Sequence, residues 1–218
     1  MGSGAALVDG DGAGRVGGAH RDGFTALVEI SQPREDDLVR AVRENQWNQL
    51  ILERAPQLGI DDWWLTAGCI AQSVWNLAAK RAIHLGIRDY DLFYYDPDTS
   101  WEAEDAIIAS AARLFADLPV EVQIRNQARV PIWYREKFGI PFGNVTRAAD
   151  GIDRFPCATV AIGVRVRDGG CEIHAPFGLG DLFDGRLKPN RALPIAHVYA
   201  EKTARWQLEW PHLSCEPW

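Results

Sequence analysis

Two aspartates separated by one residue, Asp89 and Asp91, are the side chains of this sequence best suited to chemistry. They stand at the start of an apolar segment that ends at Tyr95, a pattern that predicts a β-strand. Because side chains two apart in a strand share a face and lie about 7 Å apart, both carboxylates point at one spot. Crowded carboxylates repel each other, and their hard oxygens favour Mg²⁺ or Mn²⁺ held jointly with phosphate oxygens. The pair predicts a metal site, and the alternative is two solvated residues at a strand end.

A turn suited to phosphate precedes this pair. The segment 63–67 has the composition of a buried strand, Gly68 forms a turn, and Ile70 to Leu85 has the apolar spacing of a helix. The free N–H groups and positive dipole end at the start of a helix favour phosphate. A strand, a glycine, a helix and then paired carboxylates form a layout typical of nucleotidyl transfer.

The next predicted strand, Val120 to Ile124, can supply a third carboxylate. Glu121, Gln123 and Arg125 share one of its faces, so Glu121 is the candidate to complete a metal shell or to act as a base. An exposed glutamate with no role is the alternative.

Three further polar residues have two interpretations each. Arg129 either clamps substrate phosphates or forms an ion pair with Glu121 or Asp117. Lys202, on the last predicted helix, either reaches a triphosphate or is solvated. We interpret His174 as a core or turn residue rather than a base, because the sequence places no carboxylate to orient it.

The overall composition limits the classes of function. The chain has 218 residues, and 23 Lys and Arg against 30 Asp and Glu give a net charge of −7, which argues against a surface that binds duplex DNA. No apolar run reaches membrane-spanning length, and the four cysteines form no C-x-x-C pair, so we expect a cytoplasmic protein with reduced thiols.

The elements that must position these residues begin after a glycine-rich start. Met1 to Gly23 is predicted to be a flexible tail, since its G-x-G-x-x-G has no helical pattern after it. Residues 24–218 are predicted to form a single domain, with a core at about 34–138 and an extension at about 139–218. Further helices are expected at 33–52, 101–115 (with Thr99 and Glu102 as a capping box), 129–138, 146–155 and 195–210, and a hairpin at 159–166 with 171–174.

Beyond these patterns, the chain resembles a bacterial family of nucleotidyltransferase-like proteins in the DNA polymerase β superfamily, once classed as a domain of unknown function. The resemblance covers most of residues 34–211. The segments that carry it are Asp62–Asn76, Gly86–Asp96, Asn126–Val130, Trp133–Tyr134 and Ala175–Leu179.

The resemblance implies an α+β fold, a nucleotidyltransferase-type mixed sheet flanked by helices, here with a C-terminal α/β extension. It also implies that Asp89 and Asp91 bind metal and that the turn at Gly68 is the phosphate loop. Together with the pattern, this makes Gly68, Cys69, Ser73, Arg129 and Lys202 the candidate nucleotide-binding residues, and Asp89, Asp91 and Glu121 the candidate catalytic ones.

The expected reaction is metal-dependent transfer of a nucleoside monophosphate from an NTP to an unknown acceptor, with two divalent ions. Three positions depart from the family pattern: Cys69 in the phosphate loop, Gln123 near the third acidic position, and Pro131 in place of a histidine. Gln123 and the altered loop favour the alternative of a nucleotide-binding or scaffold protein without turnover. A nucleotide-sugar transferase is the remaining, less favoured alternative, because its D-x-D motif closes a strand more often than it opens one.

Overall fold

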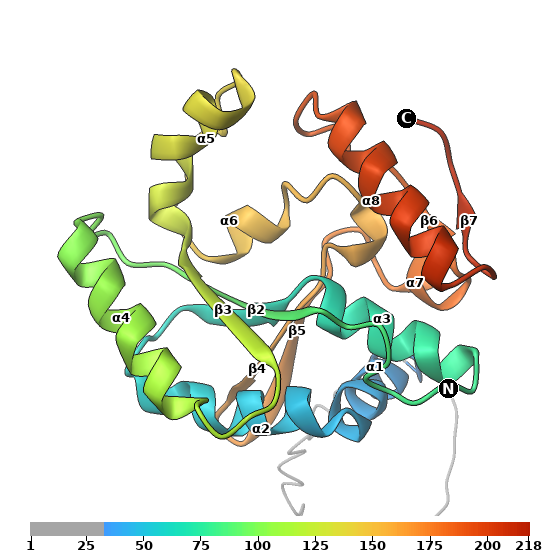
Figure 1. Cartoon of the computed structure of the whole chain (residues 1–218), viewed down its shortest axis with the longest axis horizontal. Helices are drawn as coiled ribbons and strands as arrows, with labels where there is room; N and C mark the ends of the chain where they lie inside the picture. Colours follow the sequence, from blue (N-terminus) through green and yellow to red (C-terminus); the bar gives the residue numbers. More distant parts are fainter. Residues whose placement is uncertain (1–32) are drawn as a thin grey trace, which may run out of the picture. The chain divides into compact units, whose positions relative to one another are not determined.

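A five-stranded mixed sheet forms the centre of the computed structural model, which describes residues 33–218 (Figure 1). The strand order is β3-β2-β1-β4-β5; β2 and β3 are parallel, and the other neighbours are antiparallel. The strands are β1 (Trp63–Thr66), β2 (Asp89–Tyr94), β3 (Glu121–Asn126), β4 (Gly163–Arg167) and β5 (Gly170–His174). Two short strands, β6 (Arg186–Leu187) and β7 (Ser214–Cys215), pair separately.

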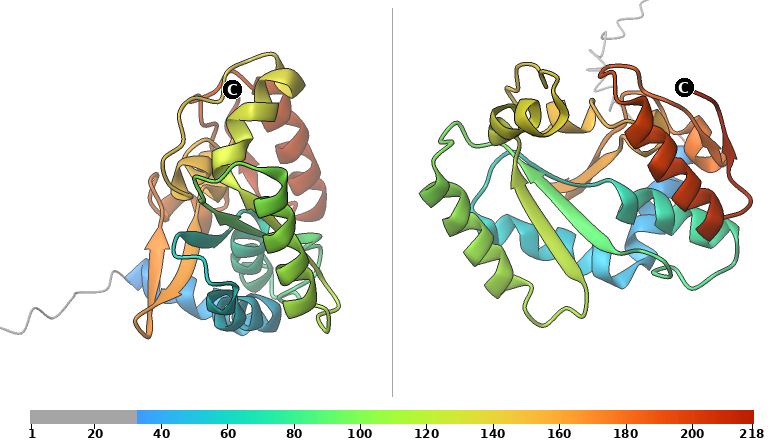
Figure 2. Two further views of the ribbon diagram at one scale, coloured as in Figure 1. Left: turned by 90° about the vertical axis from the view of Figure 1, so that its left-hand side faces the viewer. Right: turned by 45° about the horizontal axis from the view of Figure 1, so that its top comes forward.

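Helices lie on both sides of this sheet (Figures 1 and 2). In Figure 1, α2 lies below the sheet, whereas α5, α6 and α8 lie above it. The helices are α1 (Pro33–Glu44), α2 (Gln46–Arg54), α3 (Gly68–Ala78), α4 (Trp101–Leu114), α5 (Val130–Phe138), α6 (Ala149–Ile152), α7 (Gly180–Phe183) and α8 (Ala196–Glu209). The prediction of an α+β fold with a mixed sheet is confirmed.

The main core fixes which face of β2 is polar. Tyr90, Leu92 and Tyr94 alternate along the strand and are each 1% exposed, buried with residues of α1, α2 and α3. Asp89, Asp91 and Phe93 therefore face the opposite side of the sheet. Burial of the first set thus holds the two carboxylates on the face below α5, α6 and α8.

Several predicted elements differ in extent from the observed ones. The helix expected to end at Leu85 ends at Ala78, because the side-chain amide of Asn76 donates hydrogen bonds to the carbonyls of Ile83 and Leu85 and holds the chain in a loop. The predicted capping box at Thr99 is wrong: Ser100 caps α4 by accepting a hydrogen bond from the N–H of Ala103.

In the C-terminal half, the predicted helix 146–155 shrinks to α6, a single turn, while the predicted hairpin and last helix are present. Residues 33–218 belong to one compact unit. The proposed tail and its glycine motif lie outside the described residues. Within 33–218, no helix is long and apolar enough to cross a membrane.

Candidate active site

The polar face of β2 forms the floor of a cavity of about 320 Å³. Asp89, Asp91 and Phe93 line it from β2, and Gly68 and Gln72 line it from α3. Its walls come from α5, α8 and the segment around α6. Two acidic side chains thus share the cavity with four basic ones, Arg125, Arg154, Lys202 and Arg205, a composition that suits a polyphosphate with a divalent cation.

The pairing of β1 with β2 brings Asp91 next to the turn at Gly68. In the antiparallel register of β1 and β2, Asp91 lies opposite Thr66, the last residue of β1. Ala67 follows with a φ of 67°, and α3 begins at Gly68. The start of α3 therefore lies next to Asp91, as the order of these segments in the sequence predicts.

The surroundings of Asp91 disfavour the charged form of its carboxylate. Burial, followed by repulsion from Asp89, raises the pKa of Asp91 from 3.8 to about 7. The charges of Arg125 and Lys202 lower that pKa, but they do not cancel the first two effects. A cation between the two carboxylates would remove the repulsion.

Glu121 does not line the central cavity with Asp89 and Asp91. It lies next to Asp89 in the parallel register, but it is exposed, and its carboxylate accepts a hydrogen bond of 2.6 Å from Gln123. Gln123, the residue nearest to the third acidic position of the family pattern, lies opposite Asp91. Within residues 33–218, no group of three His, Cys, Asp or Glu side chains is arranged to hold a metal.

Two candidates in the phosphate loop point away from the cavity. The Ser73 hydroxyl is fully buried; it donates to the carbonyl of Cys69 at 2.7 Å and accepts from the amides of Asn45 and Asn48. The Cys69 thiol donates to the carbonyl of Thr66, and burial raises its pKa well above the usual range. These side chains hold α3 in place, so only the backbone of this turn remains available to a phosphate.

Arg129 also has a structural position. Its guanidinium forms an ion pair with Glu104 at 2.7 Å, donates to the carbonyl of Thr99, and lies 4.0 Å from the centre of the Trp101 ring. Neither of the ion-pair partners expected from the sequence is used: Asp117 pairs with Arg54, and Glu121 accepts a hydrogen bond from Gln123. Arg129 lines a separate groove between α4 and α5 rather than the central cavity.

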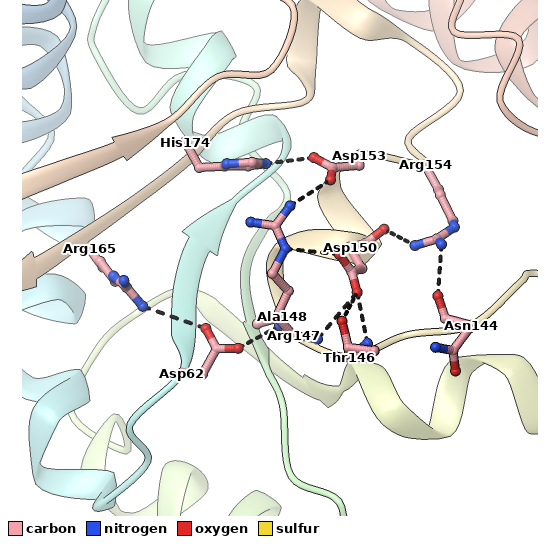
Figure 3. A network of polar contacts seen from close by, with 10 residues as sticks. All are labelled: Asp62, Asn144, Thr146, Arg147, Ala148, Asp150, Asp153, Arg154, Arg165 and His174. Carbon is pink, nitrogen blue, oxygen red and sulfur yellow. Dashed lines mark hydrogen bonds and ion pairs between the residues drawn. The ribbon is translucent and has the colours of Figure 1, made fainter.

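Lys202, by contrast, lines the central cavity from α8, together with Arg205. Arg154, which the sequence did not single out, is a third cation on its wall. Its guanidinium donates to the backbone carbonyls of Asn144 and Asp150, which fixes its position (Figure 3).

A network of charged residues ties the α6 wall to the sheet (Figure 3). Asp150 accepts hydrogen bonds from Thr146 and Arg147 in the preceding loop. Asp153, at the end of α6, contacts the imidazole of His174 on β5 at 2.6 Å. His174 therefore does have an orienting carboxylate, contrary to the expectation from sequence, and that contact anchors α6 to β5.

The comparisons with known proteins agree with this fold. A family model described as nucleotidyltransferase matches residues 53–215. The NMR structure of a protein described as a CCA-adding enzyme head domain superimposes with a TM-score of 0.66 at 23% sequence identity, over 84% of this chain and 96% of that one. A search of curated proteins finds no match. The extent of the family match places the chain in the nucleotidyltransferase family.

Proposed function

We propose that this protein transfers a nucleoside monophosphate from an NTP to an acceptor in a metal-dependent reaction. The observation that carries the proposal is the position of Asp89 and Asp91 together on the cavity floor, beside the start of α3 and below the cations of α8. The acceptor is a separate molecule whose attacking oxygen must reach the α-phosphorus from the open side of the cavity.

The two carboxylates suit Mg²⁺ or Mn²⁺. Magnesium is commonly held by one or two carboxylates with the remaining positions filled by water and substrate phosphates. Asp89 and Asp91 would hold the ions, two in number as in other phosphoryl-transfer sites, and the raised pKa of Asp91 is consistent with a missing counterion. The bound ions would neutralise phosphate charge and align the attacking oxygen.

The remaining contacts with the phosphates come from groups of the protein. The free N–H groups at the start of α3 donate hydrogen bonds to phosphate oxygens. Lys202 and Arg205 offset the charge that develops on the leaving pyrophosphate. Glu121 acts only through its charge, which contributes to the raised pKa of Asp91.

A melting experiment and an activity experiment test this proposal. Each NTP with Mg²⁺ or Mn²⁺ is screened for thermal stabilisation, since a ligand at 100 times its Kd adds about 2.7 kcal/mol. We expect stabilisation by at least one NTP only when metal is present, and none for Asp91→Asn. Stabilisation of the same size in EDTA would contradict metal dependence.

The second candidate is a nucleotide-binding scaffold without turnover, which Gln123 favours because it stands opposite Asp91 and provides no third anionic ligand. Release of pyrophosphate from the stabilising NTP in the presence of candidate acceptors separates the two functions. Binding without release under any condition would support the scaffold.

A further inference from the structure

Gln72 is a buried polar residue whose side-chain oxygen has no hydrogen-bond partner among residues 33–218. It lies on α3, one turn after Gly68, and is 6% exposed. Its Oε1 atom accepts no hydrogen bond from any described residue. Leaving a buried polar atom unpaired costs about 1–3 kcal/mol, so the side chain weakens the fold unless something else pairs with it.

The Gln72 amide lies beside the turn at Gly68. A Cβ atom added to Gly68 would lie 2.5 Å from Nε2 of Gln72, so the amide rests directly on the glycine backbone. Gln72 lines both the central cavity and a neighbouring cavity of about 210 Å³, which also share Asp89, Arg205 and Trp206. A substrate held by the start of α3 therefore comes next to this amide.

Trp206, which lines both cavities with Gln72, has a second unpaired atom. Its indole N–H is buried and donates to no described residue, and the residue is 3% exposed. The residues that line both cavities thus include one unpaired acceptor and one unpaired donor. A hydroxyl can pair with either atom, because it both donates and accepts a hydrogen bond.

The chemistry of an NTP narrows the choice of hydroxyl. Phosphate oxygens only accept, so they leave Oε1 of Gln72 unpaired. The donors of an NTP are the sugar hydroxyls and the base N–H groups, and the sugar is the part attached to the α-phosphate. With the phosphates at Gly68, the sugar is the donor nearest to Gln72.

We propose that Gln72 binds a hydroxyl of the nucleotide sugar, with Trp206 beside it, and so makes the site select ribonucleotides over one of their deoxy forms. This inference rests on the proposed function, because it needs an NTP bound at Gly68. Gln72 is a specificity-determining residue that touches the substrate, and it takes no part in the transfer itself.

The test measures binding by calorimetry with Mg²⁺, using the tightest-binding NTP and its 2′-deoxy and 3′-deoxy forms. The proteins are the wild type, Gln72→Met, and the control Gln49→Leu, which removes an exposed glutamine amide on α2. Gln72→Leu replaces the methionine variant if that variant fails to fold. One deoxy form should bind the wild type roughly 3- to 10-fold more weakly, the effect of losing one neutral hydrogen bond.

The Gln72→Met variant should bind the ribonucleotide more weakly by the same factor and show no further loss with that deoxy form. Without nucleotide it should melt no lower than the wild type, because no protein hydrogen bond of Oε1 is removed. Equal binding of all three nucleotides by the wild type, or a preference that survives in the variant, overturns the inference and leaves the proposed function standing. Weaker Mg²⁺ binding without a change in sugar preference also overturns it. No nucleotide binding by the wild type overturns both.

Discussion

Replacing Asp91 by asparagine should stabilise the metal-free protein while removing its response to metal. Asn keeps the shape of a protonated aspartate but has no charge, so it relieves the burial of an anion and the repulsion from Asp89. The same change removes an anionic ligand, so added Mg²⁺ should stabilise the variant less. Opposite effects in the two conditions separate a metal ligand from an aspartate with a purely structural role.

The magnitude follows from the pKa of Asp91 in the folded protein. That pKa is raised from 3.8 to about 7, and one pH unit corresponds to about 1.36 kcal/mol. The ionised carboxylate therefore lowers the free energy of unfolding by at most about 4 kcal/mol, and the linkage is complete only above both pKa values. For a chain of this size, about 1 kcal/mol shifts Tm by about 2–4 °C.

The sign of the pH dependence is fixed by the direction of the shift. Because the folded-state pKa lies above the unfolded one, the folded protein binds the extra proton between about pH 3.8 and pH 7. Stability due to this group is present at low pH and is lost as the pH rises through about 7. Asp91→Asn should thus melt several degrees above the wild type at pH 8 in EDTA, with a difference that narrows toward pH 5.

The assay is thermal melting of the wild type, Asp91→Asn and the control Asp61→Asn, in EDTA, in Mg²⁺, and in Mg²⁺ with NTP. Asp61 is exposed, so its neutralisation changes the net charge equally without touching the cavity. A variant that melts below the wild type in EDTA at pH 8 would refute the electrostatic reasoning. A variant that keeps the full metal-dependent shift would show that Asp91 is no ligand.

Three other substitutions and truncations test separate parts of the structure. Gly68→Val should lower NTP affinity at least about tenfold, because the new side chain covers the N–H groups at the start of α3. It should change Tm little, because it displaces only the flexible end of Gln72. If calorimetry shows unchanged affinity in a folded variant, the phosphate binds elsewhere. Arg129→Met should lower the free energy of unfolding in urea by about 3–5 kcal/mol, since it removes the ion-pair partner of Glu104 at a largely buried site, and Glu104→Gln in the same chain should restore part of it. Removing Met1–Gly23 should leave the melting temperature unchanged, and a loss of several degrees would show that this segment packs on the domain.

Local pattern was sufficient to predict the centre of the site. The strand β1, the turn at Gly68 and the strand β2 follow from runs of apolar residues and one glycine. Their antiparallel pairing, which the sequence did not predict, brings Asp91 next to the turn at Gly68. The fold class follows from the same alternation.

Partners distant in sequence could not be predicted. Arg129 pairs with Glu104, 25 positions earlier, and nothing in either segment distinguishes that partner from Asp117 or Glu121. The early end of α3 depends on contacts of the Asn76 amide with a loop, against the helix propensity of the residues that follow. In the sequence, Gln72 looks like any other polar residue of a helix. Only the structure shows that its Oε1 atom is buried without a hydrogen-bond partner among the described residues.

The register between β1 and β2 has a consequence for how relatives of this protein can be found. The phosphate turn and Asp91 meet because Thr66 pairs with Asp91 across two antiparallel strands. The 21 positions from Gly68 to Asp89 consist of α3 and the loop that follows it. Lengthening or shortening this loop changes the spacing in the sequence but not the pairing of the two strands. Search patterns that fix the number of residues between the glycine and the acidic pair will therefore miss proteins that have the same site.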